Sequence, residues 1–154
     1  MDPSKHITEN FTWVEMNIDP RTAAKVVADN AMLLCTRLLQ PLRARLGRID
    51  VTSAYRPGAK HSDHDFLAGA AVDVHLAVQI SGLDGAQRIL DAARADNLPF
   101  DQIIGYLPGI KTDPAGEHTH LGWRAHPRYQ VLLAFPGPDG TARYRPVKNF
   151  TETP

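Results

Sequence analysis

The first third of the chain has the apolar periodicity of a helix. Within residues 19–47, apolar side chains recur every three or four positions, at Ala23, Val27, Ala31, Leu34 and Leu38. This spacing places them on one face and predicts an amphipathic helix that packs on the core. Asp19 followed by Pro20 predicts where the helix starts. Pro41 predicts a break or kink that leaves a short second helix, and Gly47 predicts its end.

The middle of the chain alternates between short apolar, β-branched segments and turn residues, a pattern typical of strands. We expect strands at about 49–55, 70–76, 100–107, 118–123 and 129–135. Ser81 and Asp84 form a capping-box pattern, which predicts one helix inserted after the second strand and closed by Pro99. The predicted fold class is therefore α+β, a small antiparallel sheet with N-terminal helices and one inserted helix.

Length and composition favour one domain. The chain has 154 residues, of which 43% are hydrophobic and 22% are charged, as in an ordinary globular protein. We expect a single domain over residues 1–154, with its core in about 10–135. The remaining segment, 136–154, is rich in Pro and Gly and is interpreted as a C-terminal extension on the surface.

Charge and hydropathy argue against two classes of partner. Seventeen Lys and Arg residues balance seventeen Asp and Glu residues, so we expect no basic face for nucleic acid or anionic lipid. No apolar run approaches the roughly 18 residues of a membrane span. The N-terminal segment lacks the apolar region of a signal peptide, which predicts synthesis in the cytoplasm. The single cysteine, Cys35, lies in an apolar helical run and is interpreted as a buried small hydrophobe.

Histidine and carboxylate residues gather in two stretches of the chain. The first is "KHSDHDFLAGAAVDVHL" at 60–76, and the second is "GEHTHLGW" at 116–123. Six of the seven histidines fall between positions 61 and 126. Such clustering is typical of a metal site or an acid–base site.

Strand alternation would bring these side chains to one face of a sheet. Asp73 and His75 share a face of one predicted strand, and His118 and His120 share a face of another. A third ligand can come from either of two loop histidines, His61 and His64. Two imidazoles and one carboxylate with an open fourth position are typical of catalytic zinc sites. In such sites the pKa of the bound water falls toward about 7.

A carboxylate beside the second stretch is the candidate general base. Glu117 lies next to the strand that carries His120 and can take a proton from a metal-bound water. The two residues are three positions apart, so an ideal strand would place them on opposite faces. We therefore expect the strand to start at or after Glu117, or to bend there, and Gly116 permits such a bend.

Three motifs in order, "SAYRP", "SDHDFLAGAAVDV" and "EHTHLGW", resemble those of the M15 family of zinc peptidases. This family comprises D-Ala-D-Ala carboxypeptidases and dipeptidases and the related L-alanyl-D-glutamate endolysins of phages. Its pattern is roughly S-G-Y-R, then S-x-H-x-x-G-x-A-x-D, then W-x-H or E-x-x-H. The matching positions are Tyr55, Arg56, Ser62, His64, Gly69, Ala71, Asp73, Glu117 and His120. The resemblance covers about residues 10–135 and includes segments similar to the phage-type branch.

The resemblance implies a Hedgehog/DD-peptidase-like fold and a role for the matching residues. It implies a Zn site with three ligands, His64, Asp73 and His120. Glu117 would activate the zinc-bound water and later protonate the leaving amine. Arg56 would hold the substrate carboxylate or stabilise the oxyanion, and Ser62 would support the ligand loop by a hydrogen bond. The implied substrate is a peptidoglycan stem peptide with a D-amino acid at the scissile bond.

The chain departs from the family pattern in the loop after His64. Four residues, "DFLA", stand where the family has two, so that His64 and Asp73 are nine positions apart instead of seven. A loop can absorb two extra residues, or they can move His64 out of ligand range and promote His61 or His75. His118 stands where the family usually has an aromatic or aliphatic residue. We assign substrate binding or support of the ligands to Ser62, His75, His118 and Tyr55.

Two other functions fit parts of the sequence. A phage virion or baseplate protein could keep this fold as a structural module with a degenerate, non-catalytic site. Its partner would be a virion protein, whereas the peptidase would act on the cell wall after release or as part of a virion. An iron oxygenase would use His61 and Asp63, with His118 or His120 as the distal ligand. The helical N-terminal third and the short chain disfavour the jelly roll that this enzyme needs.

Overall fold

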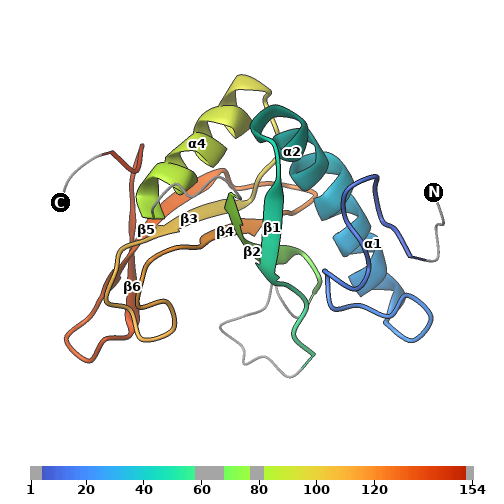
Figure 1. The fold of residues 1–154 in the computed structure, drawn as a ribbon, viewed down its shortest axis with the longest axis horizontal. Coiled ribbons are helices and arrows are strands. Elements are labelled where there is room, and N and C mark those ends of the chain that lie inside the picture. The colour runs from blue at the N-terminus through green and yellow to red at the C-terminus, as the bar shows by residue number, and fades with distance from the viewer. Residues whose placement is uncertain (1–4, 58–67, 77–81, 152–154) are drawn as a thin grey trace.

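The protein is an α+β molecule in which helices pack against one six-stranded sheet (Figure 1). The computed structural model describes residues 5–57, 68–76 and 82–151. This architecture confirms the α+β class predicted from the sequence. A single open sheet also differs from the two-sheet jelly roll that the iron-oxygenase alternative needs. Within the described ranges, no helix is long and apolar enough to cross a membrane.

The predicted N-terminal helix continues across Pro41. The helical elements are α1 (Lys25–Leu34), a π-helical turn (Cys35–Leu39), α2 (Gln40–Leu46) and α4 (Gly82–Ala95). The amide of Gln40 donates to the carbonyl of Cys35, so the helix widens just before the proline, which has no amide proton to donate. α2 ends at Gly47, as predicted. Four of the five positions of the predicted apolar face are buried, Val27, Ala31, Leu34 and Leu38, whereas Ala23 is half-buried and precedes the helix.

The start of this helix differs from the prediction. The helix begins at Lys25 rather than directly after Asp19. The carbonyl of Asp19 accepts hydrogen bonds from the amides of Thr22 and Ala23. Its carboxylate accepts hydrogen bonds from the guanidinium of Arg21. These bonds form a turn before the helix, so Asp19 is not the N-cap.

The sheet has the strand order β1-β2-β4-β3-β5-β6. Its strands are β1 (Ile49–Ser53), β2 (Ala71–Leu76), β3 (Gln102–Tyr106), β4 (Thr119–Gly122), β5 (Gln130–Pro136) and β6 (Ala142–Pro146). Each predicted strand segment overlaps one of β1 to β5. β6 was not predicted, because its side chains are exposed or half-buried and it pairs only with β5.

One pair of strands departs from the antiparallel sheet that the sequence predicted. β3 and β5 are parallel, whereas the other neighbouring pairs are antiparallel. β4 and β5 flank β3 on opposite sides. The chain runs in one direction in β3, in the opposite direction in β4, and in the first direction again in β5. β5 therefore has the direction of β3, and the sheet is mixed and mostly antiparallel.

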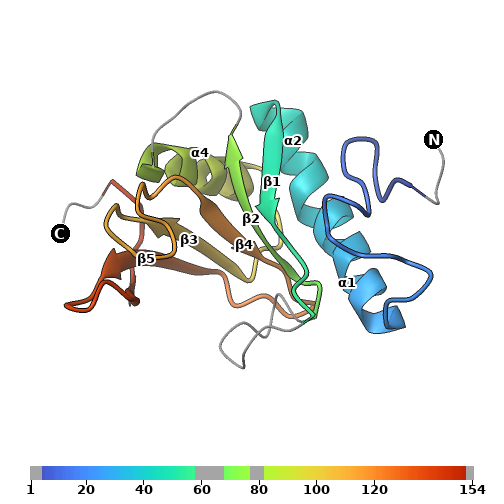
Figure 2. The ribbon, with the colours of Figure 1, turned by 60° about the horizontal axis from the view of Figure 1, so that its bottom comes forward.

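The two faces of the sheet have different roles. α4 packs on β3 and on α2, so helices cover one face (Figure 1). The strands contribute alternate side chains to the main core on this face, among them Val72, Val74, Ile103 and Leu121. Figure 2 brings the second face forward, with the strands in front of α4. This face carries a small apolar cluster of Ile104, Tyr106, Ile110 and Ala134. Asp73 and His120 alternate with main-core residues and therefore belong to the second face.

The interpretation of Cys35 as a small hydrophobe is confirmed. Its side chain is fully buried in the main core. Burial, with a smaller contribution from the charge of Glu15, raises the pKa of the Cys35 thiol to about 12. The thiol therefore stays protonated at neutral pH and is a poor nucleophile. The main core also contains the aromatic residues Phe11, Trp13 and Trp123.

Candidate metal centre

Two predicted ligands lie side by side on β2 and β4. Asp73 and His120 are register partners in this antiparallel pair, so their side chains leave the sheet on the same face. Asp73 Oδ1 lies 3.1 Å from His120 Nδ1, and both residues are buried. The sheet thus brings into contact two groups that are 47 positions apart in sequence.

The spacing of these two donors fits a shared zinc ion. Two donors at about 2.0–2.2 Å from a tetrahedral zinc ion lie roughly 3.3–3.6 Å from each other. The 3.1 Å between Asp73 Oδ1 and His120 Nδ1 is close to that separation. The same contact serves as a hydrogen bond when no cation lies between the two groups. Carboxylate and imidazole are both ordinary zinc donors, so the chemistry of the pair also fits the metal.

The third predicted ligand, His64, lies outside the described residues, as do Ser62, His61 and Asp63. Among residues 5–57, 68–76 and 82–151, no three His, Cys, Asp or Glu side chains form a group that could hold a metal ion. The described part of the chain therefore supplies two adjacent donors. The assignment of His64 as the third stays a prediction.

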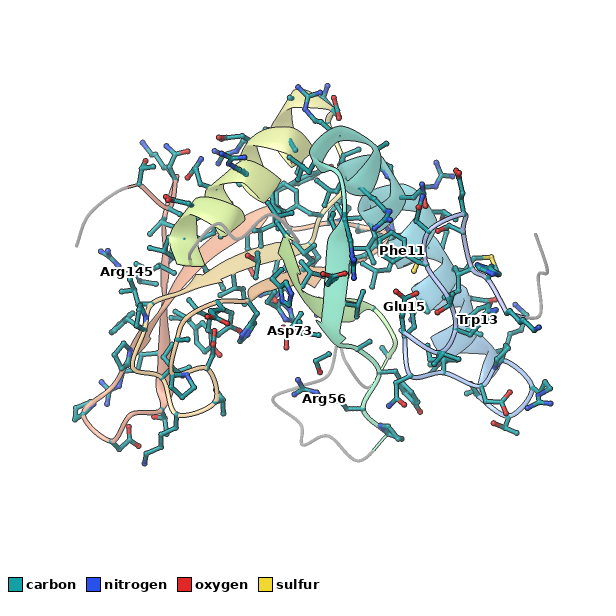
Figure 3. All side chains as sticks on the ribbon, in the orientation of Figure 1. Phe11, Trp13, Glu15, Arg56, Asp73 and Arg145 are labelled. Carbon is teal, nitrogen blue, oxygen red and sulfur yellow. The ribbon has the colours of Figure 1, made fainter. Side chains whose placement is uncertain are left out.

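Arg56 reaches the Asp73 carboxylate from the end of β1. The pairing of β1 with β2 shifts by one residue between Val51 and Ser53, which brings Ser53 opposite Asp73. Arg56 Nη2 lies 3.3 Å from Asp73 Oδ2, and Arg56 Nε and Nη2 donate to Ser53 Oγ at 3.0 and 2.7 Å. Figure 3 shows Arg56 and Asp73 on the side of the sheet away from α4. The Arg56 side chain is 43% exposed, so it is accessible to an anionic group of a ligand.

His118 lies on the same face and contacts two carboxylates. Its Nδ1 atom is 2.7 Å from Asp113 Oδ2, and its Nε2 atom is 3.9 Å from Asp73 Oδ1. The ring stacks on Tyr106 with a centroid separation of 4.1 Å and an interplanar angle of 37°. His118 therefore has a fixed position next to the Asp73–His120 pair. The sequence analysis assigned it to substrate binding or support of the ligands.

Asp113 is a residue of this site that the sequence analysis missed. It lies in the turn-rich loop before β4, and its carboxylate accepts hydrogen bonds from the amides of Glu117 and His118 at 3.2 and 3.4 Å. An aspartate before a proline in such a loop signals capping of nearby backbone amides. The sequence of this loop does not predict the contact of Asp113 with the His118 ring, because the contact depends on how the loop returns to the sheet.

Tyr106 is a second residue that the sequence analysis missed. Burial raises the pKa of its phenol, and so do its hydrogen bond with Tyr144 and the charges of Asp73 and Asp113. The phenol therefore stays neutral beside the site. Strand alternation in β3 places Tyr106 on the same face as Ile104. It does not show that this face also carries Asp73 and His120, because that depends on the order of the strands in the sheet.

Glu117 precedes the strand that carries His120. β4 begins at Thr119, and the chain turns at Gly116, which has a φ of +65°. This agrees with the expectation that the strand starts at or after Glu117. The side chain of Glu117 is exposed, so its carboxylate is accessible to water and to a substrate.

Gly116→Ala is expected to destabilise the protein more than Gly109→Ala. An added Cβ at Gly116 would lie 2.8 Å from the backbone atoms Tyr106 O and Pro108 N, whereas at Gly109 it would meet only Pro136 at 3.5 Å. Both glycines have positive φ in the same loop. We expect a loss of about 1 kcal/mol at Gly109 from backbone strain, and roughly 1 kcal/mol more at Gly116 from overpacking. Urea unfolding measures both losses, and equal values would contradict the close approach at Gly116.

His75 and Tyr55 contact residues outside the Asp73–His120 pair. His75 is on the face of Asp73, as predicted, but its Nε2 atom lies 3.8 Å from Asp50 Oδ2 on β1. Its side chain is 45% exposed. Tyr55 packs against the main core. The predicted support of ligands or substrate by these two residues therefore stays a prediction.

The described residues form a polar site beside the small apolar cluster of the second face. Asp73 and His120 present two donors to a cation, and Arg56 beside them presents a charged donor to an anion. Such a combination suits a substrate with one group that a metal ion polarises and with a carboxylate that an arginine binds. No protein-family model matches the chain, and no curated protein is significantly similar to it.

Proposed function

We propose that the chain is a zinc-dependent peptidase that hydrolyses peptidoglycan stem peptides at a D-amino acid bond. The observation that carries this proposal is the contact of Asp73 with His120 at 3.1 Å, because the two residues match different ligand motifs of the M15 peptidases. The protein would be phage-encoded, and its fold would be Hedgehog/DD-peptidase-like. It would act on the cell wall after release or as part of a virion.

Three residues would hold the zinc ion: Asp73 through Oδ1, His120 through Nδ1, and His64 from the segment between β1 and β2. When bound, zinc supplies a Lewis acid and lowers the pKa of a coordinated water toward about 7. The second oxygen of Asp73 contacts Arg56 at 3.3 Å, which orients the carboxylate as a ligand.

Glu117 and Arg56 would carry the remaining chemistry. The exposed carboxylate of Glu117 would accept a proton from the attacking water and return it to the leaving amine. Arg56 is anchored by Ser53 and still exposes part of its guanidinium, which would bind a carboxylate of the substrate. On a substrate cut internally, the same group would stabilise the oxyanion.

Zinc content and peptide digestion of the purified protein test this proposal together. We expect about one zinc ion per chain and release of stem-peptide fragments from purified peptidoglycan. Mass spectrometry of the products identifies the bond that is cut. A matched synthetic stem peptide with an L-residue in place of the D-residue is the control and should stay intact. Failure to bind zinc at micromolar free metal would rule the proposal out.

A structural role in a virion is the second candidate. It is favoured by the ion pair of Arg56 with Asp73, which pairs one carboxylate oxygen with a side chain of the protein and not with a metal ion. This reading expects neither zinc nor digestion, together with binding to another virion protein. A peptidase carried by a virion would instead show zinc, digestion and the virion contact.

A further inference from the structure

The carboxylate of Asp113 holds His118 at both its backbone and its ring. Oδ2 accepts a hydrogen bond from the His118 amide at 3.4 Å and lies 2.7 Å from Nδ1 of the same residue. Oδ1 accepts a hydrogen bond from the Glu117 amide at 3.2 Å. Asp113 is buried, and its own amide and carbonyl are hydrogen bonded to Ile110 and Gly116. The carboxylate is therefore fixed by its loop, and it fixes His118 in turn.

This arrangement determines which nitrogen of the neutral His118 ring carries the proton. An ionised carboxylate only accepts hydrogen bonds, so Nδ1 must donate to Asp113 and Nε2 must keep its lone pair. Nε2 lies 3.9 Å from Asp73 Oδ1, which is too long for a direct hydrogen bond. Nε2 therefore faces the Asp73–His120 pair with its lone pair, and the contact with Tyr106 holds the ring in that orientation.

We propose that Asp113 is a positioning residue, which holds His118 so that Nε2 accepts a hydrogen bond from a substrate N–H group beside Asp73 and His120. Peptide substrates carry such N–H groups on both sides of the bond that is cut. His118 would touch the substrate, whereas Asp113 would act through His118 and would not touch the substrate itself. The inference rests on the proposed function, because it takes the N–H group from the peptide substrate of that site.

Three variants separate this role from a purely structural one. Asp113→Asn replaces one acceptor oxygen by an amino group, which cannot accept the hydrogen bonds that both carboxylate oxygens accept now. His118→Phe keeps a ring for the stack on Tyr106 and removes both ring nitrogens. The double variant combines the two changes. The matched control is Asp50→Asn, the same substitution in a carboxylate that lies 3.8 Å from His75 on the same face of the sheet.

The kinetic test uses the full-length, zinc-loaded protein and a synthetic stem peptide. Asp113→Asn and His118→Phe should each lower kcat/KM about 10- to 100-fold while zinc content is retained. The double variant should lose less than the product of the two single losses, because the effect that Asp113 has through His118 is absent when His118 is replaced. Asp50→Asn should keep the wild-type rate. Additive losses in the double variant, or a wild-type rate for Asp113→Asn, would overturn the inference.

A second measurement does not depend on activity. Nitrogen-15 NMR of the imidazole rings in metal-free wild-type protein, at mildly alkaline pH, reports which nitrogen carries the proton. We expect the proton of His118 on Nδ1 in the wild type and a changed pattern in Asp113→Asn. A proton on Nε2 in an active enzyme would overturn the inference alone. The expected tautomer in a protein that binds no zinc and cuts no peptide would overturn the substrate contact together with the proposed function.

Discussion

Replacing His120 by alanine is expected to remove bound zinc and to abolish digestion of peptidoglycan. His120 supplies one of the two donors that the structure holds in contact, and catalytic zinc sites have only about three protein ligands. Zinc measured by atomic absorption should fall from about one ion per chain to background. Glu117→Gln should behave differently, because it removes a base and no ligand. We expect it to keep zinc and to lose about 100- to 10,000-fold in kcat.

Two further histidine variants are controls for the loss of zinc and activity in His120→Ala. His126 is exposed, so His126→Ala should keep both zinc and activity. His75→Ala should also keep zinc. Zinc loss in that variant would mean that the longer loop after His64 has shifted the site toward His75. Retention of zinc and activity by His120→Ala would show that the Asp73–His120 pair is not the metal centre.

Local sequence patterns predicted most of the secondary structure elements but not their arrangement. The spacing of Val27, Ala31 and Leu34 predicts a buried helical face, because all three residues lie on the same helix and their spacing alone places them on one side of it. The strand order and the parallel pair of β3 with β5 depend on which distant segments meet, and alternation within a strand does not encode this. β6 was missed because an edge strand with exposed Arg and Tyr side chains has no buried face to mark it.

For the candidate site, too, the sequence predicted individual residues but not all of their contacts. Motif spacing and alternation selected Asp73 and His120, and the register of β2 with β4 brings them into contact. Alternation also grouped His75 with Asp73, which is right for the face. It could not show that His75 lies beside the carboxylate of Asp50 on β1. Asp113 was not predicted, because its contact with a site imidazole arises from the path of a loop rather than from a repeating pattern.

Asp101→Asn is expected to destabilise the protein by about 3 kcal/mol at neutral pH. Asp101 is fully buried, and its carboxylate accepts a hydrogen bond from the Arg128 amide at 3.1 Å. It also pairs with the guanidinium groups of Arg128 and Arg124, at 2.5 and 3.2 Å. A neutral amide cannot replace these contacts. The two arginine side chains are 40% and 45% exposed and can be hydrated after the change, which keeps the loss near the lower end for a broken buried ion pair.

The origin of this loss in an ion pair can be tested by pH and by a matched control. Asp96→Asn removes a carboxylate that pairs with Arg45 at 2.7 Å, but both side chains are partly exposed, so we expect less than about 1 kcal/mol. Burial alone would raise the pKa of Asp101, yet the hydrogen bonds and charges of Arg128 and Arg124 hold that pKa below its ordinary value. A carboxyl group of this kind stabilises the fold above its unfolded pKa of about 3.9, and the contribution is lost as pH falls through the folded pKa. In urea unfolding, the stability difference between the wild type and Asp101→Asn should therefore be full at about pH 7 and shrink below about pH 4. A difference that stays constant across this range would mean that packing around Asp101, and not its charge, joins β3 to the loop that carries Arg124 and Arg128.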